Sequence, residues 1–487
     1  MKEKREEFTY HLGFILTMLG MAIGTGNIWR FPRIVASTGG GAFLIPWTIF
    51  LFMWSIPLMI LEFSIGRSTK RGVIYSFSAI SNGKLTWMGL FVVYTTLSIM
   101  FYYSSVTGWC IRYLLFSAEG RFTDIDLPST SLLFEKFVTG GWQVFFHILA
   151  ISLAGFIVYK GVVKGIEKAN IIFIPSLFLL LLLCLIRVIT IRNGFKGIEY
   201  LFDINFSRLK DYSVWLEALT QSAWSTGAGW GLVLTYAIYM KKNEDVFLNS
   251  LVTGFGNNSA SLLAGMVVFG TVFATASSLG EAMGILSISG RGGTGLTFET
   301  LPALFAHIPM GYFLSLLFFL GLTFAAMSSL ISMVEMGTRI FIDFGIDRKI
   351  ATLIVTLLGM LFGLPSAILI DFFENQDWVW GMGLILNGLF FSIIVIKYGV
   401  DKFRENFINR GNVIRIGKWF EYLIFLIPVQ FGILIVWWFS KSIGWENDWW
   451  NPLKKYSLAT ILCQWLLIIF LSIIFNKKIV KLHELEK

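Results

Sequence analysis

Long apolar stretches of about twenty residues recur along the chain, separated by short polar segments. An α-helix needs about twenty such residues to cross the hydrocarbon core of a membrane. The pattern predicts an all-α membrane protein with about twelve transmembrane helices, each in contact with a lipid bilayer. We expect these helices near residues 11–37, 41–66, 86–117, 142–159, 167–190, 213–240, 247–276, 309–343, 349–368, 374–397, 418–440 and 457–476.

Two of these apolar stretches are interrupted by glycines near their midpoints. One interruption, at residues 20–27, has glycine at positions 20, 24 and 26, and the other, at residues 225–231, has glycine at 227, 229 and 231. A glycine in a helix interior costs about 1 kcal/mol relative to alanine, so such clusters favour local unwinding. Unwound backbone at bilayer depth is tolerated only where it lines a cavity or is buried in protein. Paired interruptions in two halves of a chain indicate a secondary transporter.

The two interruptions also suggest how the chain is organised. Predicted helices 1–5 and 6–10 each begin with a glycine-broken segment. We therefore expect two five-helix repeats, residues 1–195 and 205–400, of inverted topology because each repeat has an odd number of spans. Residues 401–487 would form a polar cytoplasmic linker, helices 11 and 12 and a short charged tail.

Composition and charge agree with a membrane protein and exclude other classes. The chain is 56% hydrophobic and 14% charged, with a mean hydropathy of +0.72, which excludes a soluble fold. The formal charge is +9, and most Lys and Arg residues fall in the tails and in alternate loops, which places both termini in the cytoplasm. No basic segment is interleaved with aromatic residues, so we expect no nucleic-acid partner. The spans contain no His-Glu-x-x-His motif or paired aspartates, so we expect no enzyme.

Hydroxyl groups on predicted helix 8 are candidates for binding a cation. Ala325, Ser328 and Ser329 recur at helical spacing, and Glu335 follows further along the helix. Small residues with serine are also common where membrane helices pack together, which is the alternative interpretation. If these hydroxyls face an unwound segment with free carbonyls, together they supply the oxygen ligands that a monovalent cation needs.

Glu62 and two adjacent tyrosines are the other polar groups in apolar spans. An ionised carboxylate at Glu62 is expensive unless it finds donors. An unwound helix would offer backbone N–H groups; the alternative is partial hydration near Arg67. Tyr102 and Tyr103 lie in the middle of helix 3, where they pack between helices or face a substrate.

The run at residues 20–32, Gly-Met-Ala-Ile-Gly-Thr-Gly-Asn-Ile-Trp-Arg-Phe-Pro, and the Gly-Gly-Gly-Ala-Phe-Leu-Ile-Pro run at 39–46 resemble the helix 1–2 motif of the neurotransmitter:sodium symporter family. The similarity continues through Tyr102-Tyr103, residues 221–231, Asn257 and residues 325–335, and so covers helices 1–10. The resemblance implies a sodium-coupled symporter of a neutral amino acid that works by alternating access. Sodium ions would be its cofactors.

The resemblance implies two sodium sites. The first would use the substrate carboxylate with Ala22, Asn27, Ser225 and Asn257. The second would use Gly20, Ile23, Ala325, Ser328 and Ser329. Ser225 and Ser328 stand where relatives have threonine, so an oxygen is retained at both positions.

The resemblance also implies a substrate site. The carboxylate would meet the backbone around Thr25 and Gly26, at the positive end of a half-helix, and the Tyr103 hydroxyl. Monoamine carriers of the family have an aspartate at the position of Gly24, so an uncharged residue there favours an amino acid. The expected substrate-binding residues are Ala22, Gly24, Thr25, Gly26, Ile99, Tyr103, Trp224, Ser225, Gly227, Trp230, Ser329 and Met333.

A chloride site is implied by one residue on helix 7. Chloride-independent relatives carry a glutamate at the position of Ser261, whereas chloride-dependent members have serine. We therefore expect uptake to be stimulated by chloride. The surrounding donors would be Trp47, Gln221, Ser225, Asn257 and Ser261; Trp47 replaces a tyrosine whose hydroxyl usually takes part, so its indole N–H would have to donate instead. The alternative is that these polar residues only bridge helices.

Gates follow from the same resemblance. Arg30 and Asp377 would bridge above the substrate on the outside, with Tyr103 and Trp224 beneath them. Arg5, Asp343 and Tyr239 would close the inside, and Phe8 replaces a tryptophan common in relatives.

Two other functions remain open from the sequence. The substrate could be a carboxylated osmolyte, such as a β- or γ-amino acid or betaine, or the chain could be an amino acid sensor that does not transport. The predicted outer loop at 118–141 has no cysteine, unlike the disulfide-bearing loop of animal members. We therefore expect a multi-pass protein of a prokaryotic plasma membrane.

Overall fold

The computed structural model describes residues 6–290, 293–410 and 412–485, which form helices and no strand. Ten helices in this part of the chain are long and apolar enough to cross a membrane, and one bent pair makes an eleventh span. Eight of the ten are single helices: α6 (Thr86–Ala118), α8 (Gly141–Tyr159), α13 (Val246–Thr275), α16 (Gly311–Asp343), α17 (Arg348–Ile368), α18 (Ile370–Tyr398), α20 (Trp419–Trp445) and α21 (Leu458–Leu485). The other two are longer segments. Gly40–Thr69 contains α3 (Leu44–Phe50) and α4 (Ile56–Thr69), and Val162–Ile189 contains α9 (Lys168–Ile189).

The bent pair corresponds to the first predicted span, 11–37. It breaks within the glycine-rich segment 20–27, as the sequence predicted. α1 (His11–Ala22) and α2 (Gly26–Ser37) meet at 52°. Ile23 has extended backbone angles, with φ −81° and ψ 103°, so its carbonyl leaves the helical hydrogen-bond pattern. The break therefore brings the carbonyl end of α1 and the N-terminal end of α2 to the same place.

The sixth predicted span, 213–240, is broken as well, and its two halves are too short to cross a membrane alone. α11 (Tyr212–Ser225) and α12 (Leu232–Ala237) are separated by six residues. Within them Gly227, Gly229 and Gly231 have φ of +70°, +84° and +78°, a backbone conformation that residues with side chains rarely adopt. The alternate glycines are the reason that this span unwinds.

Central and peripheral helices differ in how much of their apolar surface the protein covers. The most apolar windows of α18, α16 and α6 are 83%, 78% and 72% buried, whereas those of α20 and α21 are 33% and 28% buried. The first group forms the centre of the bundle, against the two broken spans. The second group turns most of its surface outward, as helices that contact lipid do.

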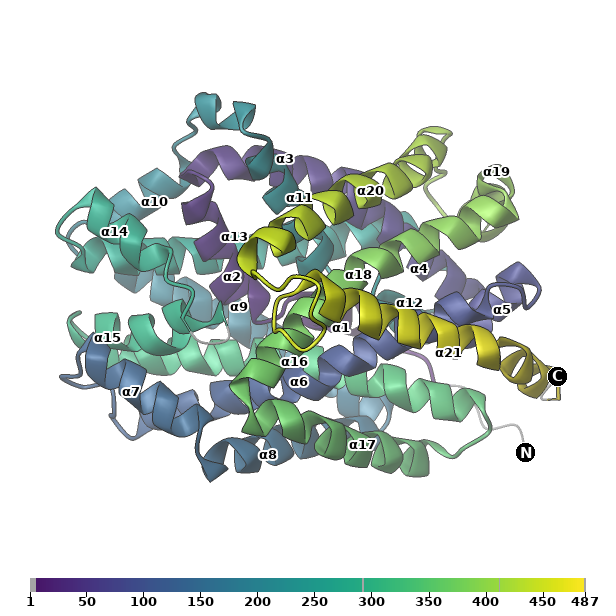
Figure 1. Cartoon of the computed structure of the whole chain (residues 1–487), viewed down its shortest axis with the longest axis horizontal. Coiled ribbons are helices and arrows are strands. Elements are labelled where there is room, and N and C mark those ends of the chain that lie inside the picture. Colours follow the sequence, from purple (N-terminus) through teal and green to yellow (C-terminus); the bar gives the residue numbers. More distant parts are fainter. Residues whose placement is uncertain (1–5, 291–292, 411, 486–487) are drawn as a thin grey trace.

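Short helices cover the two ends of the bundle (Figure 1). α7 (Leu127–Val138), α10 (Gly194–Phe202), α14 (Leu279–Leu286) and α15 (Leu301–Ala306) lie at one end, and α5 (Val73–Ser81), α19 (Val400–Phe403) and the end of α21 lie at the other. The segment 277–308 between α13 and α16 contains both α14 and α15; Arg291 and Gly292 lie outside the described residues.

Candidate functional site

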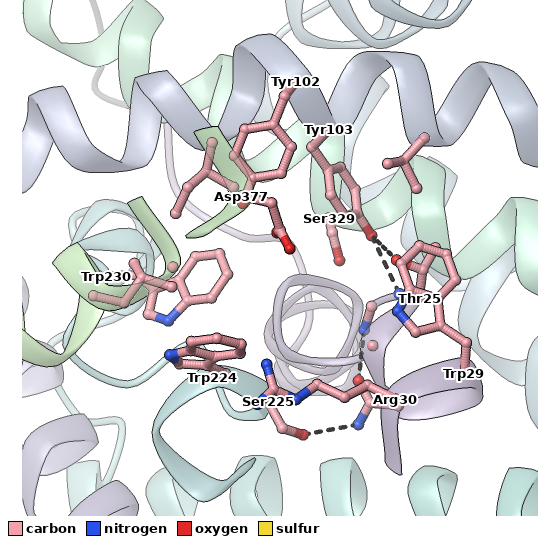
Figure 2. Close-up of a pocket in the computed structure, with 18 of the residues that line it drawn as sticks. Thr25, Trp29, Arg30, Tyr102, Tyr103, Trp224, Ser225, Trp230, Ser329 and Asp377 are labelled. Atoms are coloured by element: carbon pink, nitrogen blue, oxygen red, sulfur yellow. Dashed lines mark hydrogen bonds between the residues drawn. The ribbon is translucent and has the colours of Figure 1, made fainter. Parts of the chain in front are cut away.

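A cavity of about 160 Å³ lies where the two broken spans face α6, α16 and α18. Figure 2 shows Tyr102 and Tyr103 of α6 on one side of it and Trp224 and Arg30 on the other. Every residue predicted to bind substrate lines this cavity: Ala22, Gly24, Thr25, Gly26, Ile99, Tyr103, Trp224, Ser225, Gly227, Trp230, Ser329 and Met333.

One end of the cavity is built to receive an anion. The Tyr103 hydroxyl accepts hydrogen bonds from the Thr25 backbone N–H, at 3.2 Å, and from the Thr25 hydroxyl, at 3.1 Å. α2 begins at Gly26, so the positive end of its dipole faces the same space. The site is tight at Gly24, because a Cβ there would lie 3.2 Å from Ser329 Oγ and 3.3 Å from Tyr103 Oη and would have to displace them.

The other end of the cavity is apolar and has two indoles. Trp224 comes from α11, and Trp230 lies within the break between α11 and α12. Between them Gly227 has to be glycine, because its φ is +70° and a Cβ would lie 2.5 Å from Met21 Sδ. Four further apolar residues line the cavity: Met21, Val106, Phe373 and Leu384. They were not predicted, because nothing in the sequence shows that these distant segments meet here.

The residues of the first predicted sodium site lie together beside the cavity. Asn27 Nδ2 donates to Ser225 Oγ at 3.1 Å and to Asn257 Oδ1 at 2.8 Å. Asn257 Oδ1 also lies 3.2 Å from the Ala22 carbonyl oxygen and 2.9 Å from the Ser225 carbonyl oxygen. Buried oxygens this close repel unless a cation lies among them or the Asn257 amide turns over, which would bring its nitrogen 2.8 Å from Asn27 Nδ2. The donor set is neutral oxygen, which fits a sodium ion.

The residues of the second predicted sodium site meet where α1 ends against α16. Ser329 Oγ donates to the Ile23 carbonyl at 3.3 Å, and Ser328 Oγ donates to the Ala325 carbonyl at 3.1 Å. Gly20 approaches so closely that a Cβ on it would lie 3.2 Å from Ser328 Cβ. The carbonyl end of a half-helix carries partial negative charge, so these groups also fit a monovalent cation.

Three of the predicted chloride residues, Ser225, Asn257 and Ser261, lie together around Asn27. Ser261 Oγ accepts from Asn27 Nδ2 at 2.8 Å, which joins it to Ser225 and Asn257. Trp47 is 2% exposed, and its indole N–H has no hydrogen-bond partner in the described part of the chain. Gln221 Oε1 is also buried without a partner, but it is an acceptor, so it needs a donor and not an anion. A buried donor without an acceptor is costly, and an anion would satisfy it.

Glu62 obtains its hydrogen bonds from the second break, as the sequence predicted. Its carboxylate accepts from the Gly229 N–H at 2.6 Å and from the Leu234 N–H at 3.2 Å. Arg67 is not its partner, because that guanidinium donates to backbone carbonyls around residues 407–410 and to Glu244 O and Asn412. Glu62 therefore fixes the unwound backbone in place from α4.

The outer gate that the sequence predicted is not closed in this structure. Arg30 and Asp377 both line the cavity, but no ion pair joins them in the part of the chain described here. The Arg30 guanidinium instead lies over the Trp224 ring, 3.5 Å from its centroid. Asp377 faces Tyr102 (Figure 2). The physical reason is that the ring face offers Arg30 a cation–π contact on the opposite side of the cavity from Asp377.

A second cavity of about 470 Å³ adjoins the first. The two cavities share Arg30, Trp224 and Asp377, so the site is reached from this side. On its rim Lys455 lies 2.9 Å from Asp371 and contacts Glu374. Burial lowers the pKa of Lys455, but hydrogen bonds to the two carboxylates outweigh it and raise the pKa above its ordinary value.

The opposite end of the site is closed. Phe8 is 2% exposed, and its N–H donates to the Tyr239 carbonyl at 3.2 Å. Tyr239 Oη donates to Glu335 at 2.5 Å, and Arg348 pairs with the same carboxylate at 2.7 Å. Glu335 and Arg348 were not among the predicted gate residues.

The predicted inner ion pair of Arg5 with Asp343 stays a prediction. Arg5 lies outside the described residues. Asp343 pairs with Arg339 at 2.6 Å and with Arg71 at 3.9 Å. Arg339 lies on the same helix as Asp343, and Arg71 lies in the segment between α4 and α5, so two cations lie beside this carboxylate.

Two broken helices around a closed-ended cavity, with neutral oxygens gathered at the breaks, define a secondary transporter. Comparison with known proteins agrees with this class. The sodium:neurotransmitter symporter family matches residues 5–125 and 134–482. The chain belongs to this family of transporters, which are not enzymes, and it is a multi-pass, sodium-coupled membrane protein.

Relatives and solved structures support the assignment. An uncharacterized sodium-dependent transporter of Methanocaldococcus jannaschii is 34% identical, over 86% of this chain and 87% of its own length. A sodium- and chloride-dependent GABA transporter of Drosophila melanogaster is 26% identical over 83% of this chain and 48% of its own length. The crystal structure of MhsT in complex with L-phenylalanine matches with a TM-score of 0.76 and 28% identity, and covers 89% of this chain and 99% of that one.

Proposed function

We propose that this protein couples sodium entry to uptake of a neutral amino acid by alternating access. The observation that carries the proposal is the carboxylate-sized end of the cavity, formed by Thr25, the start of α2 and the Tyr103 hydroxyl. Gly24 provides no charge there that could balance an amine without its own carboxylate. A substrate with a carboxylate therefore fits better than a biogenic amine.

The size and lining of the cavity indicate the side chain. Pockets for drug-sized ligands are about 300–1,000 Å³, so a cavity of about 160 Å³ selects a smaller molecule. Trp224 and Trp230 make the opposite end apolar, and Gly227 leaves space between them. MhsT was crystallised with L-phenylalanine, so aromatic amino acids belong among the candidates with small and medium aliphatic ones.

The sodium ions would bind at the two sets of oxygens described above. In the first site the substrate carboxylate would complete the ligands Ala22, Asn27, Ser225 and Asn257. Because the ion and the substrate would touch, each raises the affinity of the other by the same factor. Binding at the second site would join α1 to α16 through Ile23 and Ser329.

Each half of the chain opens on a broken span, which supports inverted repeats at residues 1–195 and 205–400, followed by residues 401–487. The chain would lie in the plasma membrane of a prokaryote, since similar proteins occur in an archaeon and in Bacillus subtilis. Both termini would be cytoplasmic, so the larger cavity would open outward.

Thermal unfolding of the purified protein tests the substrate class. Each of the twenty amino acids, GABA, betaine and a set of decarboxylated amines would be added with sodium or with potassium. We expect neutral α-amino acids to raise the melting temperature, and only in sodium. Stabilisation by GABA or betaine alone would favour the osmolyte carrier. Stabilisation by an amino acid without any flux into vesicles would favour a sensor.

We also propose that chloride binds beside the first sodium site, supported by the unpartnered indole N–H of Trp47 and by the serine at position 261. Ser261→Glu is expected to make uptake largely independent of chloride, because a fixed carboxylate replaces the anion near sodium. Sodium-driven uptake would be measured in chloride and in gluconate.

Ser261→Ala is the matched control for this experiment. It removes the hydroxyl without adding charge, so it is expected to weaken the response to chloride rather than replace it. Equal uptake of the unmodified protein in the two anions would contradict the chloride proposal.

A further inference from the structure

Two glycines of α1 lie against polar side chains at the start of the fifth span. A Cβ on Gly13 would lie 2.1 Å from Glu167 Oε1, and a Cβ on Gly20 would lie 2.0 Å from Asn170 Oδ1. Both partners are almost wholly buried. The Glu167 carboxylate has hydrogen-bond donors, since it accepts from the backbone N–H groups of Thr9 and Tyr10 at 3.1 and 3.3 Å. The Asn170 side-chain oxygen has none in the described residues.

The Asn170 amide is only half satisfied. Its Nδ2 donates to the Ile166 carbonyl at 2.9 Å, one turn earlier on the chain. Its Oδ1 has no hydrogen-bond partner in the described residues, and the side chain is 0% exposed. Turning the amide over would place Oδ1 against the Ile166 carbonyl oxygen, so the observed orientation is the favourable one. A buried acceptor left without a donor destabilises the folded protein.

The unpartnered oxygen lies near two residues of the second sodium site, Gly20 and Ser328. The same position on Gly20 that lies 2.0 Å from Asn170 Oδ1 lies 3.2 Å from Ser328 Cβ. Gly20 and Ser328 are both expected ligands of that site, through a carbonyl and a hydroxyl. Asn170 Oδ1 therefore lies close to Gly20 and Ser328, on a third helix segment next to α1 and α16.

We propose that Asn170 supplies a further neutral oxygen to the cation of the second sodium site. The inference rests on the proposed second site. It explains why position 20 is glycine in this chain, since any side chain there would occupy the place of the Asn170 amide. It also adds the fifth span to the elements that the ion holds together, which otherwise are α1 and α16.

Sodium-dependent thermal unfolding of the full-length protein, without substrate, tests the proposal. Asn170→Leu keeps the volume and removes the oxygen. A hydrogen bond or similar contact to a charged group contributes about 1.5–3 kcal/mol, and each 1.4 kcal/mol is about tenfold. We expect the sodium concentration for half-maximal stabilisation to rise about tenfold or more. Gln143→Leu removes an equally buried amide from α8 and is expected to leave that concentration unchanged.

Asn170→Asp keeps an oxygen at the same place and adds a titratable charge. We expect it to bind sodium more tightly than the unmodified protein at alkaline pH and to lose this advantage as the carboxylate is protonated. This variant decides the matter if Asn170→Leu fails to fold. An unchanged sodium midpoint in Asn170→Asp at every pH would then overturn the proposal.

A purely structural role gives a different result. Asn170→Leu would then lower the melting temperature equally at all sodium concentrations and leave the midpoint unchanged, which would overturn this inference. If Ser329→Ala raises the midpoint and Asn170→Leu does not, only the role of Asn170 fails. If neither variant changes it, the second site itself is wrong.

Discussion

Ser329→Ala is expected to abolish sodium-driven uptake while the protein still folds and inserts into the membrane. The Ser329 hydroxyl is 4% exposed and lies 3.3 Å from the Ile23 carbonyl, where α1 breaks. Alanine removes one of the few neutral oxygens at that place, and no neighbouring side chain replaces it. Uptake of labelled substrate into proteoliposomes at increasing sodium concentration measures the loss.

Ser315→Ala is the matched control on the same helix. Ser315 is equally buried, and its hydroxyl donates to the Tyr312 carbonyl at 2.8 Å, near the opposite end of α16. It is expected to keep the sodium dependence of the unmodified protein. If Ser329→Ala also kept that dependence, the second sodium site would have to be abandoned.

Tyr103→Phe is expected to weaken substrate binding by about ten- to hundredfold. The hydroxyl lies where the substrate carboxylate would bind, and a hydrogen bond to a charged group contributes about 1.5–3 kcal/mol. Each 1.4 kcal/mol corresponds to about tenfold in affinity. Equilibrium binding of the amino acid selected by the thermal screen, in saturating sodium, gives the change in Kd.

A second tyrosine on α6 provides the control. Tyr113 is buried, its hydroxyl has no hydrogen-bond partner in the described residues, and it does not line the cavity. Tyr113→Phe should bind substrate as the unmodified protein does. Binding of decarboxylated amines by the unmodified protein, as tightly as of amino acids, would show that the carboxylate assignment is wrong.

The breaks in the helices were predictable because their cause is local. Glycines at alternate positions weaken a helix whatever surrounds them, and the chain indeed unwinds at residues 226–231 and near Ile23. The hydrogen bonds of Glu62 followed from the same logic, since a buried carboxylate needs donors and an unwound segment provides them.

The partners of charged groups were not predictable, because they depend on which helices meet. Arg30 lies over Trp224 instead of pairing with Asp377. Asp343 pairs with Arg339, one turn before it on α16, and Tyr239 contacts Glu335 and Arg348. The role proposed for Asn170 could not be predicted from the sequence, since a single asparagine at the start of an apolar span forms no recognisable motif. It is suggested only by the contact with Gly20 on another helix.

Sodium-gradient-driven accumulation of a labelled neutral amino acid in proteoliposomes tests the central claim most directly. With sodium high outside and low inside, the account predicts that the internal concentration of the amino acid rises well above the external one. Adding an ionophore that collapses the sodium gradient should release the accumulated substrate. Equal concentrations on both sides in the presence of the gradient, from protein that binds the amino acid, would contradict coupled transport.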